Sequence, residues 1–328
     1  MSSCAGSWSN SWSKRCPVGI LPQSCDGVAP TLPSGVGGYS ERVLRIEIDG
    51  RTPDADDLAA ALLSQYGHFT AMQVRGHRVR GFDLHLARLT AATAELFGVG
   101  LDTDLVRHRV RHALTEEYAD SDVRIQVLRL NPAGGTRAGA AETGAAEPGA
   151  AEPGVAESTA PADPTIMVIA RPPVDPPRVP WNLRSVRYQR PLAHIKQVGG
   201  SFGQIYHGRA AEDDGYADAL LTADDGTVSE TSIANIGFFD GAAITWPDAP
   251  ALDGITKQLL QRHGSGAGLL SKAARVTLDD VATYRAAFVT NSQGVAPVSA
   301  IDGTPLAVDG DLMATLYEVY ESVPWDAI

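Results

Sequence analysis

The residue with the clearest chemical potential is Lys196, which follows the largely apolar residues 191–195 and precedes a glycine pair. Lysine is scarce in this chain, and the only others are Lys14, Lys257 and Lys272. An arginine keeps its proton, whereas a desolvated lysine amine becomes neutral and can form a Schiff base with an aldehyde. A lone lysine is most often a solvated surface charge, so its neighbourhood has to decide between these two interpretations.

A carboxylate and two patterns that could bind an anion accompany this lysine. Glu230 lies 34 residues further along, in a strand-like run that starts at an Asp-Gly turn. Ile255 and Thr256 open an amphipathic helix after a glycine, and the free N–H groups of a helix start attract anions. Asn291 and Ser292 form a small polar loop at the end of a strand. Each of these residues, taken alone, would be a surface carboxylate, a helix cap or a turn.

The periodicity of apolar residues predicts the elements that hold these side chains. In the first half we expect strands at 43–48, 69–74, 79–82, 123–130 and 165–170, and helices at 55–63, 84–97 and 104–117. In the second half we expect strands at 183–188, 219–222, 236–239 and 286–289, and helices after Ser201 and Thr256. Residues 191–196 also read as a strand, which would place His194 and Lys196 on the same side.

This pattern predicts an α+β protein with two domains. The expected divisions are a small domain at 41–172, a proline-rich linker at 173–180 and a larger domain at 181–328. Residues 1–40 read as a disordered tail, and the Ala-Gly-Glu-Pro-rich residues 132–164 as a disordered insertion between two strands.

Composition excludes several classes of function. The chain has 328 residues, a net charge of -12 and no apolar run of transmembrane length, so neither a nucleic-acid nor a membrane partner is expected. All three cysteines lie within the first 25 residues and have no metal-ligand spacing. We therefore expect no metal site and no disulfide framework. The apolar run at 18–21 is too short for the core of a signal peptide, so we expect a cytoplasmic location.

Four motifs in this order resemble the class IV, or fold type IV, aminotransferases, a family of pyridoxal-phosphate enzymes. The motifs are the helix start 82–89, which resembles the family's apolar-x-x-x-His-Leu-x-Arg-Leu pattern, the lysine, the run through Glu230 at the family's usual interval, and the two polar loops. The similarity runs from about Ile46 to Asp302, apart from the insertion. It implies a small N-terminal α/β sandwich domain, a larger C-terminal pseudo-barrel domain and a homodimer.

The resemblance also implies roles for individual residues. Lys196 would form the Schiff base with pyridoxal 5'-phosphate and relay a proton, and Glu230 would pair with the pyridine nitrogen. The cofactor phosphate would be held by Arg88, Ile255, Thr256, Asn291 and Ser292.

The chain departs from the family at two places. Relatives often carry Asn-Tyr soon after the lysine, and that tyrosine bonds the phenolic oxygen of the cofactor. This chain has Gly200-Ser201 there, and Tyr206 is a candidate substitute. Relatives often have Arg or Lys, which can bind a substrate carboxylate, where this chain has Gln73. Candidates to replace that cation are Arg75, Arg78, Arg80, Arg187 and Arg190. We expect contacts with substrate from Thr70, Gln73, His194 and Tyr206, with packing roles as the alternative for the last two.

The leading hypothesis is therefore an aminotransferase that moves an amino group between an amino acid or amine and a 2-oxo acid. One alternative is a lyase of the aminodeoxychorismate type, which releases pyruvate, because Phe69-Thr70 resembles a segment of that lyase. The other is a non-catalytic binding protein that keeps the fold.

Overall fold

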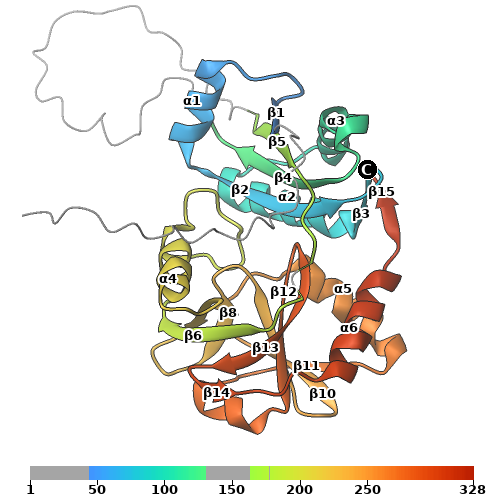
Figure 1. Ribbon diagram of the computed structural model, residues 1–328. Coiled ribbons are helices and arrows are strands. Elements are labelled where there is room, and N and C mark those ends of the chain that lie inside the picture. Colours follow the sequence, from blue (N-terminus) through green and yellow to red (C-terminus); the bar gives the residue numbers. More distant parts are fainter. Residues whose placement is uncertain (1–43, 131–162, 177) are drawn as a thin grey trace, which may run out of the picture. The chain divides into compact units, whose positions relative to one another are not determined.

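The computed structural model describes residues 44–130, 163–176 and 178–328 (Figure 1). The predicted tail at 1–40 and nearly all of the predicted insertion at 132–164 lie outside these ranges, so their predictions are not tested.

The first sheet has four antiparallel strands in the order β1-β5-β4-β2. They are β1 (Arg45–Ile48), β2 (Gly67–Val74), β4 (Ser121–Leu128) and β5 (Thr165–Arg171). β4 and β5 pair along their whole length, from Leu128 opposite Thr165 to Asp122 opposite Arg171. The two strands on either side of the predicted insertion are thus direct neighbours.

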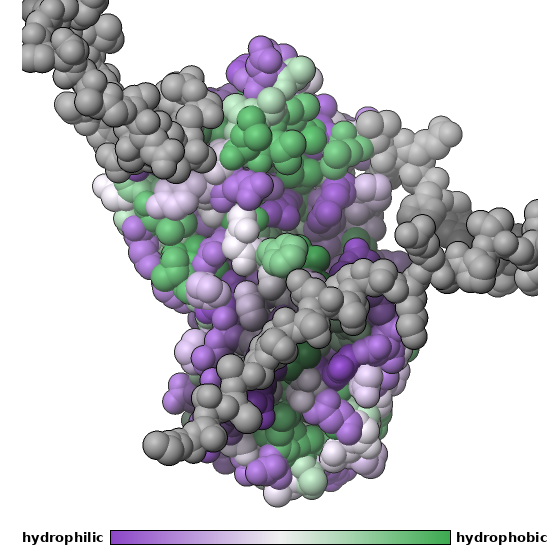
Figure 2. Space-filling view, turned by 90° about the vertical axis from the view of Figure 1, so that its left-hand side faces the viewer, coloured by the Kyte–Doolittle hydropathy of each residue, from purple (hydrophilic) through white to green (hydrophobic). Residues whose placement is uncertain are grey.

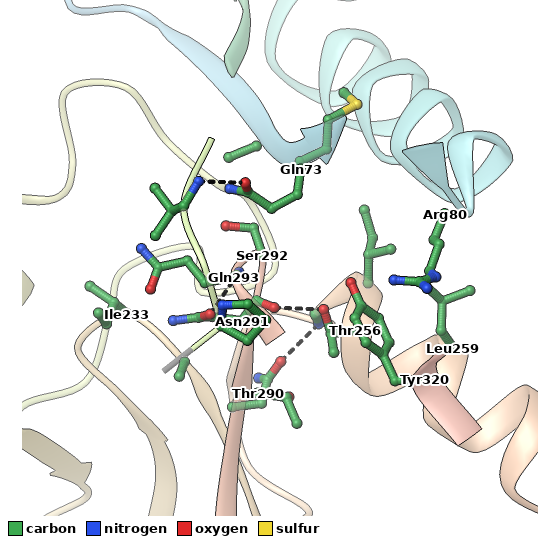
Figure 3. Close-up of a pocket in the computed structure, with 18 of the residues that line it drawn as sticks. Gln73, Arg80, Ile233, Thr256, Leu259, Thr290, Asn291, Ser292, Gln293 and Tyr320 are labelled. Atoms are coloured by element: carbon green, nitrogen blue, oxygen red, sulfur yellow. Dashed lines mark hydrogen bonds between the residues drawn. The ribbon is translucent and has the colours of Figure 1, made fainter. Parts of the chain in front are cut away.

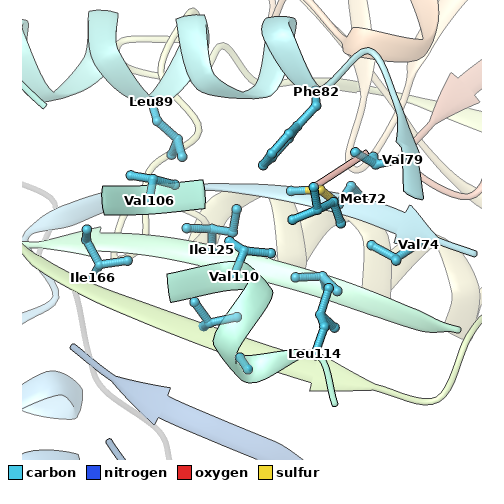
Figure 4. Packing of buried hydrophobic residues seen from close by; sticks show 14 of the residues in the cluster. Met72, Val74, Val79, Phe82, Leu89, Val106, Val110, Leu114, Ile125 and Ile166 are labelled. Carbon is cyan, nitrogen blue, oxygen red and sulfur yellow. The ribbon is translucent and has the colours of Figure 1, made fainter. Parts of the chain in front are cut away.

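Two helices, α2 (Phe82–Phe97) and α3 (Thr103–Ala113), cover one face of this sheet (Figure 4). Phe82 and Leu89 of α2 and Val106 and Val110 of α3 are almost completely buried against it. Burying a side chain of this size contributes about 1.5–3 kcal/mol, so this layer holds the first half together. On the other face lies α1 (Ala55–Ser64), which starts with a capping box at Asp54.

The second sheet has nine strands, eight of them in the order β11-β10-β9-β12-β13-β6-β7-β8. Their bounds are β6 (Trp181–Arg187), β7 (Asp218–Thr222), β8 (Val228–Thr231), β9 (Asn235–Phe239), β10 (Ala243–Pro247), β11 (Leu270–Ala274), β12 (Ala286–Asn291), β13 (Gly294–Ile301) and the short β14 (Thr304–Pro305), which pairs with β13. β13 pairs in parallel with β6 and β6 with β7, whereas the neighbours of β12 are antiparallel. The sheet is therefore mixed.

Three helices accompany the second sheet: α4 (Phe202–Asp213), α5 (Ile255–Gly264) and α6 (Gly310–Ser322). Leu260 of α5 and Leu316 of α6 share a buried cluster with Trp246 and Phe288 of the sheet. After α6 the chain returns to the first half, where β15 (Trp325–Ala327) pairs with β3 (Arg78–Arg80), as Figure 1 shows at the red end of the chain. The second half thus contributes a strand to the first.

Two predicted elements are wrong. The helix expected at 104–117 ends at Ala113, and a separate short 3-10 turn follows at Glu116–Tyr118. The strand expected at 191–196 is a series of turns in which Leu192 has a φ of 48°. His194 and Lys196 therefore do not share the face of a strand, because the carbonyls of Ala193 and Ile195 accept hydrogen bonds from Arg190, whereas the Lys196 carbonyl bonds to Phe69 of β2.

Candidate active site

A single cavity of about 330 Å³ brings most of the predicted site residues together. Its lining includes Gln73, Arg88, Lys196, Glu230, Ile255, Thr256, Asn291 and Ser292. Six cationic side chains and three carboxylates line it, although the whole chain has a net charge of -12. Such a cavity is suited to a ligand that carries negative charge.

The Lys196 amine sits in a poorly solvated, positively charged part of the cavity. Its Nζ atom lies 4.9 Å from the centre of the Phe69 ring, and its carbonyl accepts a 2.8 Å hydrogen bond from the Phe69 N–H. Burial, followed by the charges of Arg88 and Arg190, lowers the pKa of Lys196 to about 8. A substantial fraction of this amine is therefore neutral near physiological pH, which is the form that attacks an aldehyde.

Glu230 projects from β8, and each of its carboxylate oxygens accepts one hydrogen bond from the protein. One carboxylate oxygen accepts a 2.7 Å hydrogen bond from Arg190, and the other accepts a 3.2 Å hydrogen bond from the Leu252 N–H. Both partners of this ion pair are buried. Burial raises the pKa of Glu230, and the Arg190 guanidinium offsets part of that rise. The carboxylate is thus held in one orientation at the cavity wall.

The start of α5 and the turn between β12 and β13 lie side by side at another part of the cavity (Figure 3). The Thr256 hydroxyl donates a 2.6 Å hydrogen bond to the Asn291 carbonyl and joins the two. The Asn291 side chain accepts a 2.9 Å hydrogen bond from the Gln293 N–H and fixes the turn. The first N–H groups of a helix have no acceptor within the helix, so this corner offers backbone donors to an anion.

Arg88 reaches this corner from α2, the helix that covers the first sheet. It donates a 2.6 Å hydrogen bond to the Asp253 carbonyl, two residues before α5. Burial lowers the pKa of Arg88 to about 10, which leaves it cationic at neutral pH. A full positive charge therefore adjoins the backbone donors.

Gln73 is the one predicted substrate residue that lines the cavity. Its side-chain oxygen accepts hydrogen bonds from the Val174 N–H at 3.0 Å and from Arg75 at 3.2 Å. Its amide nitrogen is buried and has no hydrogen-bond partner among the described residues. Because the two donors fix which end of the amide is the oxygen, an unused N–H donor remains at the cavity wall.

The structure does not bring the other three predicted substrate residues to the cavity. The Thr70 hydroxyl lies 2.7 Å from His85 Nδ1 in the core, and burial, followed by the charge of Arg88, lowers the pKa of His85 to about 3. His194 faces Glu95 at 2.9 Å on the surface. Tyr206 is 59% exposed on α4.

Two residues at the cavity were missed by sequence reasoning. Arg190 was considered only as one of several arginines that might bind a carboxylate. Asn235, in β9, donates to the Leu252 carbonyl at 2.7 Å and accepts from the Gly254 N–H at 3.0 Å, so it holds the loop before α5. A Cβ on Gly254 would clash with the Asn235 side chain, which explains why a glycine precedes the helix. That glycine was the available signal.

In a comparison with known protein families, the chain matches the amino-transferase class IV model over residues 67–301. The chain belongs to the class IV aminotransferase family. The matched range contains Lys196, Glu230, both polar loops and most of both sheets. The predicted family is confirmed. A comparison with curated protein sequences finds no match.

Solved structures of similar fold include both transaminases and lyases. A 4-amino-4-deoxychorismate lyase from Pseudomonas aeruginosa is 23% identical, with a TM-score of 0.66 over 85% of this chain and 99% of the lyase. A branched-chain aminotransferase from Thermoproteus uzoniensis is 18% identical, with a TM-score of 0.66 over 84% and 93%. A hypothetical aminotransferase from Mycobacterium tuberculosis, in its PLP-bound form, is 19% identical, with a TM-score of 0.67 over 86% and 98%. These likenesses show that this class IV aminotransferase family member has the expected fold type IV.

Proposed function

We propose that this protein is a pyridoxal-phosphate enzyme that transfers an amino group between an amino acid or amine and a 2-oxo acid. The observation that carries the proposal is the Lys196 amine, with its pKa lowered to about 8, in one cavity with a buried carboxylate and a corner of anion donors. The cofactor is an aldehyde with a dianionic phosphate and a basic ring nitrogen. Its three functional groups match these three features.

The residues fit this cofactor one by one. The backbone donors at Ile255 and Thr256, the turn at Asn291 and Ser292, and the Arg88 charge would hold the phosphate. Glu230 would pair with the ring nitrogen and keep it protonated. The bound ring supplies an electron sink for the bond that breaks at the substrate carbon.

Lys196 has two tasks in this proposal. As a neutral amine it would bind the cofactor aldehyde, and as a free amine its Nζ would take the proton from the substrate α-carbon. Its lowered pKa matters for both tasks, because a protonated amine can do neither. Gln73, through its unused N–H, would donate to an oxygen of the substrate.

A decisive first test is the visible spectrum of the purified protein, with and without added pyridoxal phosphate. We expect an absorption band that Lys196→Ala removes, and borohydride should fix the cofactor on the peptide that contains Lys196. A colourless protein that cannot be loaded would refute both enzyme hypotheses and leave the non-catalytic binding protein.

The second candidate function is a lyase that releases pyruvate, which the similar lyase structures favour. The sequence argument for it is weaker than expected, because Thr70 is directed at His85 and does not line the cavity. Mixing the loaded protein with an amino donor separates the two reactions. Transamination converts the cofactor to its amine form and then requires 2-oxoglutarate or another acceptor, whereas the lyase releases pyruvate from its substrate with no acceptor.

We also propose that the protein acts as a homodimer in the cytoplasm. Phe202, Ile205 and Tyr206 form an exposed apolar surface on α4, and Leu62 and Leu63 of α1 are more than 70% exposed. Figure 2, which views the side of α1 and α4, shows apolar groups on this face. Exposed apolar groups of this extent favour an interface. No described helix has the length and apolar character needed to cross a membrane. Sedimentation of the wild type and of Phe202→Asp would test the dimer, since the variant should shift toward monomer.

A further inference from the structure

The guanidinium of Arg190 links the segment that carries Lys196 to the Glu230 carboxylate. It donates to Glu230 Oε1 at 2.7 Å and to the carbonyls of Ala193 and Ile195 at 3.0 Å each. Ile195 directly precedes Lys196, so one buried side chain connects the segment that carries the amine to the carboxylate on β8. The turns at 191–196 wrap around this group in place of a strand.

Arg190 retains donors for a further acceptor. A guanidinium has five N–H bonds, and the three hydrogen bonds use both hydrogens of Nη1 and one of Nη2. The N–H of Nε and the second hydrogen of Nη2 have no acceptor among the described residues, although Arg190 lines the cavity. A buried cation with unused donors at a cavity wall is suited to an anionic oxygen of a ligand.

The order of groups around the pyridoxal ring indicates which oxygen this is. Going round one edge from the ring nitrogen, a methyl carbon comes first, then the carbon with the phenolic oxygen, then the carbon with the aldehyde. The phosphate arm is on the other edge. The proposed function requires the nitrogen at Glu230 and the aldehyde at Lys196. The edge with the phenolic oxygen then faces Arg190, which is bonded both to Glu230 and to the segment before Lys196.

We propose that Arg190 binds the phenolic oxygen of the cofactor and at the same time positions Glu230 and Lys196. No tyrosine is available for this oxygen at the expected place. Ser201 does not line the cavity, Tyr206 is exposed on α4, and Tyr320 lies beside Leu259 and Arg80 next to α5 (Figure 3). The Arg190 guanidinium would take the place of the tyrosine hydroxyl that relatives often have, and its positive charge would favour the ionised form of the phenolic oxygen.

The test compares two cofactors on three proteins. Pyridoxal phosphate and its 3-O-methyl ether, which lacks the ionisable phenolic oxygen, are each titrated into the cofactor-free wild type, Arg190→Gln and Arg187→Gln, and dissociation constants are measured from absorbance. Arg187 is the matched control, because it is exposed and does not line the cavity. Borohydride fixation on the Lys196 peptide first establishes that the wild type takes up pyridoxal phosphate.

For each protein, the dissociation constant of the ether is divided by that of pyridoxal phosphate. We expect this ratio to be about 10- to 100-fold smaller in Arg190→Gln than in the wild type and in Arg187→Gln. The midpoint of the pH-dependent change in visible absorbance should also rise in Arg190→Gln, because removing a nearby cation favours the protonated cofactor. Arg190→Lys, which keeps the charge, should restore part of both effects and serves if Arg190→Gln does not fold.

Equal ratios in all three proteins, with normal uptake of pyridoxal phosphate, would overturn the role of Arg190 and leave the proposed function standing. Absence of uptake by the wild type would instead overturn the proposed function itself.

Discussion

The buried amine of Lys196 should make the cofactor-free protein less stable than it could be. Burial lowers the pKa of this group from 10.5 to about 8. In the unfolded chain the amine keeps its ordinary pKa, so below pH 8 the folded state carries the full cost of holding a desolvated cation. We therefore predict that Lys196→Met stabilises the cofactor-free protein at neutral pH while abolishing cofactor fixation.

The magnitude follows from the two pKa values. At about 1.4 kcal/mol per pH unit, the difference amounts to about 3 kcal/mol near pH 7. A group whose folded pKa is lowered in this way binds fewer protons when folded, so its cost shrinks as pH rises from 8 toward 10.5. Near pH 9.5 about 1.5 kcal/mol should remain. The advantage of Lys196→Met should thus fall by about half across this range.

Urea unfolding of both proteins at several pH values measures this difference directly. Lys272→Met is the control, because Lys272 is 59% exposed and its ion pair with Asp240 is at 4.0 Å. Its stability should stay within about 0.5 kcal/mol of the wild type at every pH. If Lys196→Met is no more stable than the wild type at pH 7, or if its advantage does not change with pH, the amine is not desolvated and the argument for its reactivity fails.

Three further predictions concern the elements around the site. Asn235→Ala removes two hydrogen bonds from the loop before α5, so it should cost about 1–3 kcal/mol in thermal unfolding and weaken phosphate-dependent cofactor binding. Thr70→Val should cost about 1–2 kcal/mol, because His85 loses a buried partner, yet leave the rate with saturating substrate nearly unchanged in a steady-state assay. Replacing residues 131–162 with a short turn should leave the melting temperature and cofactor binding intact, since Leu128 and Thr165 are already paired. A large loss of activity in Thr70→Val, or of folding in the deletion variant, would contradict these expectations.

Much of the fold could be predicted from local sequence. The helix starting near 255 and the strands at 165–170, 219–222 and 236–239 were expected from the pattern of apolar residues and lie where expected, because most of those apolar side chains are buried. The prediction of a helix at 104–117 was too long. The amphipathic pattern continues past Ala113, but the helix ends there.

The sequence by itself determined which chemistry is available: an isolated lysine, a carboxylate at a fixed interval, and two polar loops that could accept a phosphate. These features are local, and their order along the chain already indicated the family. Only the tertiary structure decided how they meet. Residues 191–196 read as a strand, but the carbonyls of Ala193 and Ile195 bond to the Arg190 guanidinium, which also bonds to Glu230, 40 residues beyond Arg190. In the folded chain His194 faces Glu95 outside the cavity, whereas Arg190 lines the cavity. No local pattern of the sequence predicts the contact between Arg190 and Glu230, because it joins residues far apart in the chain.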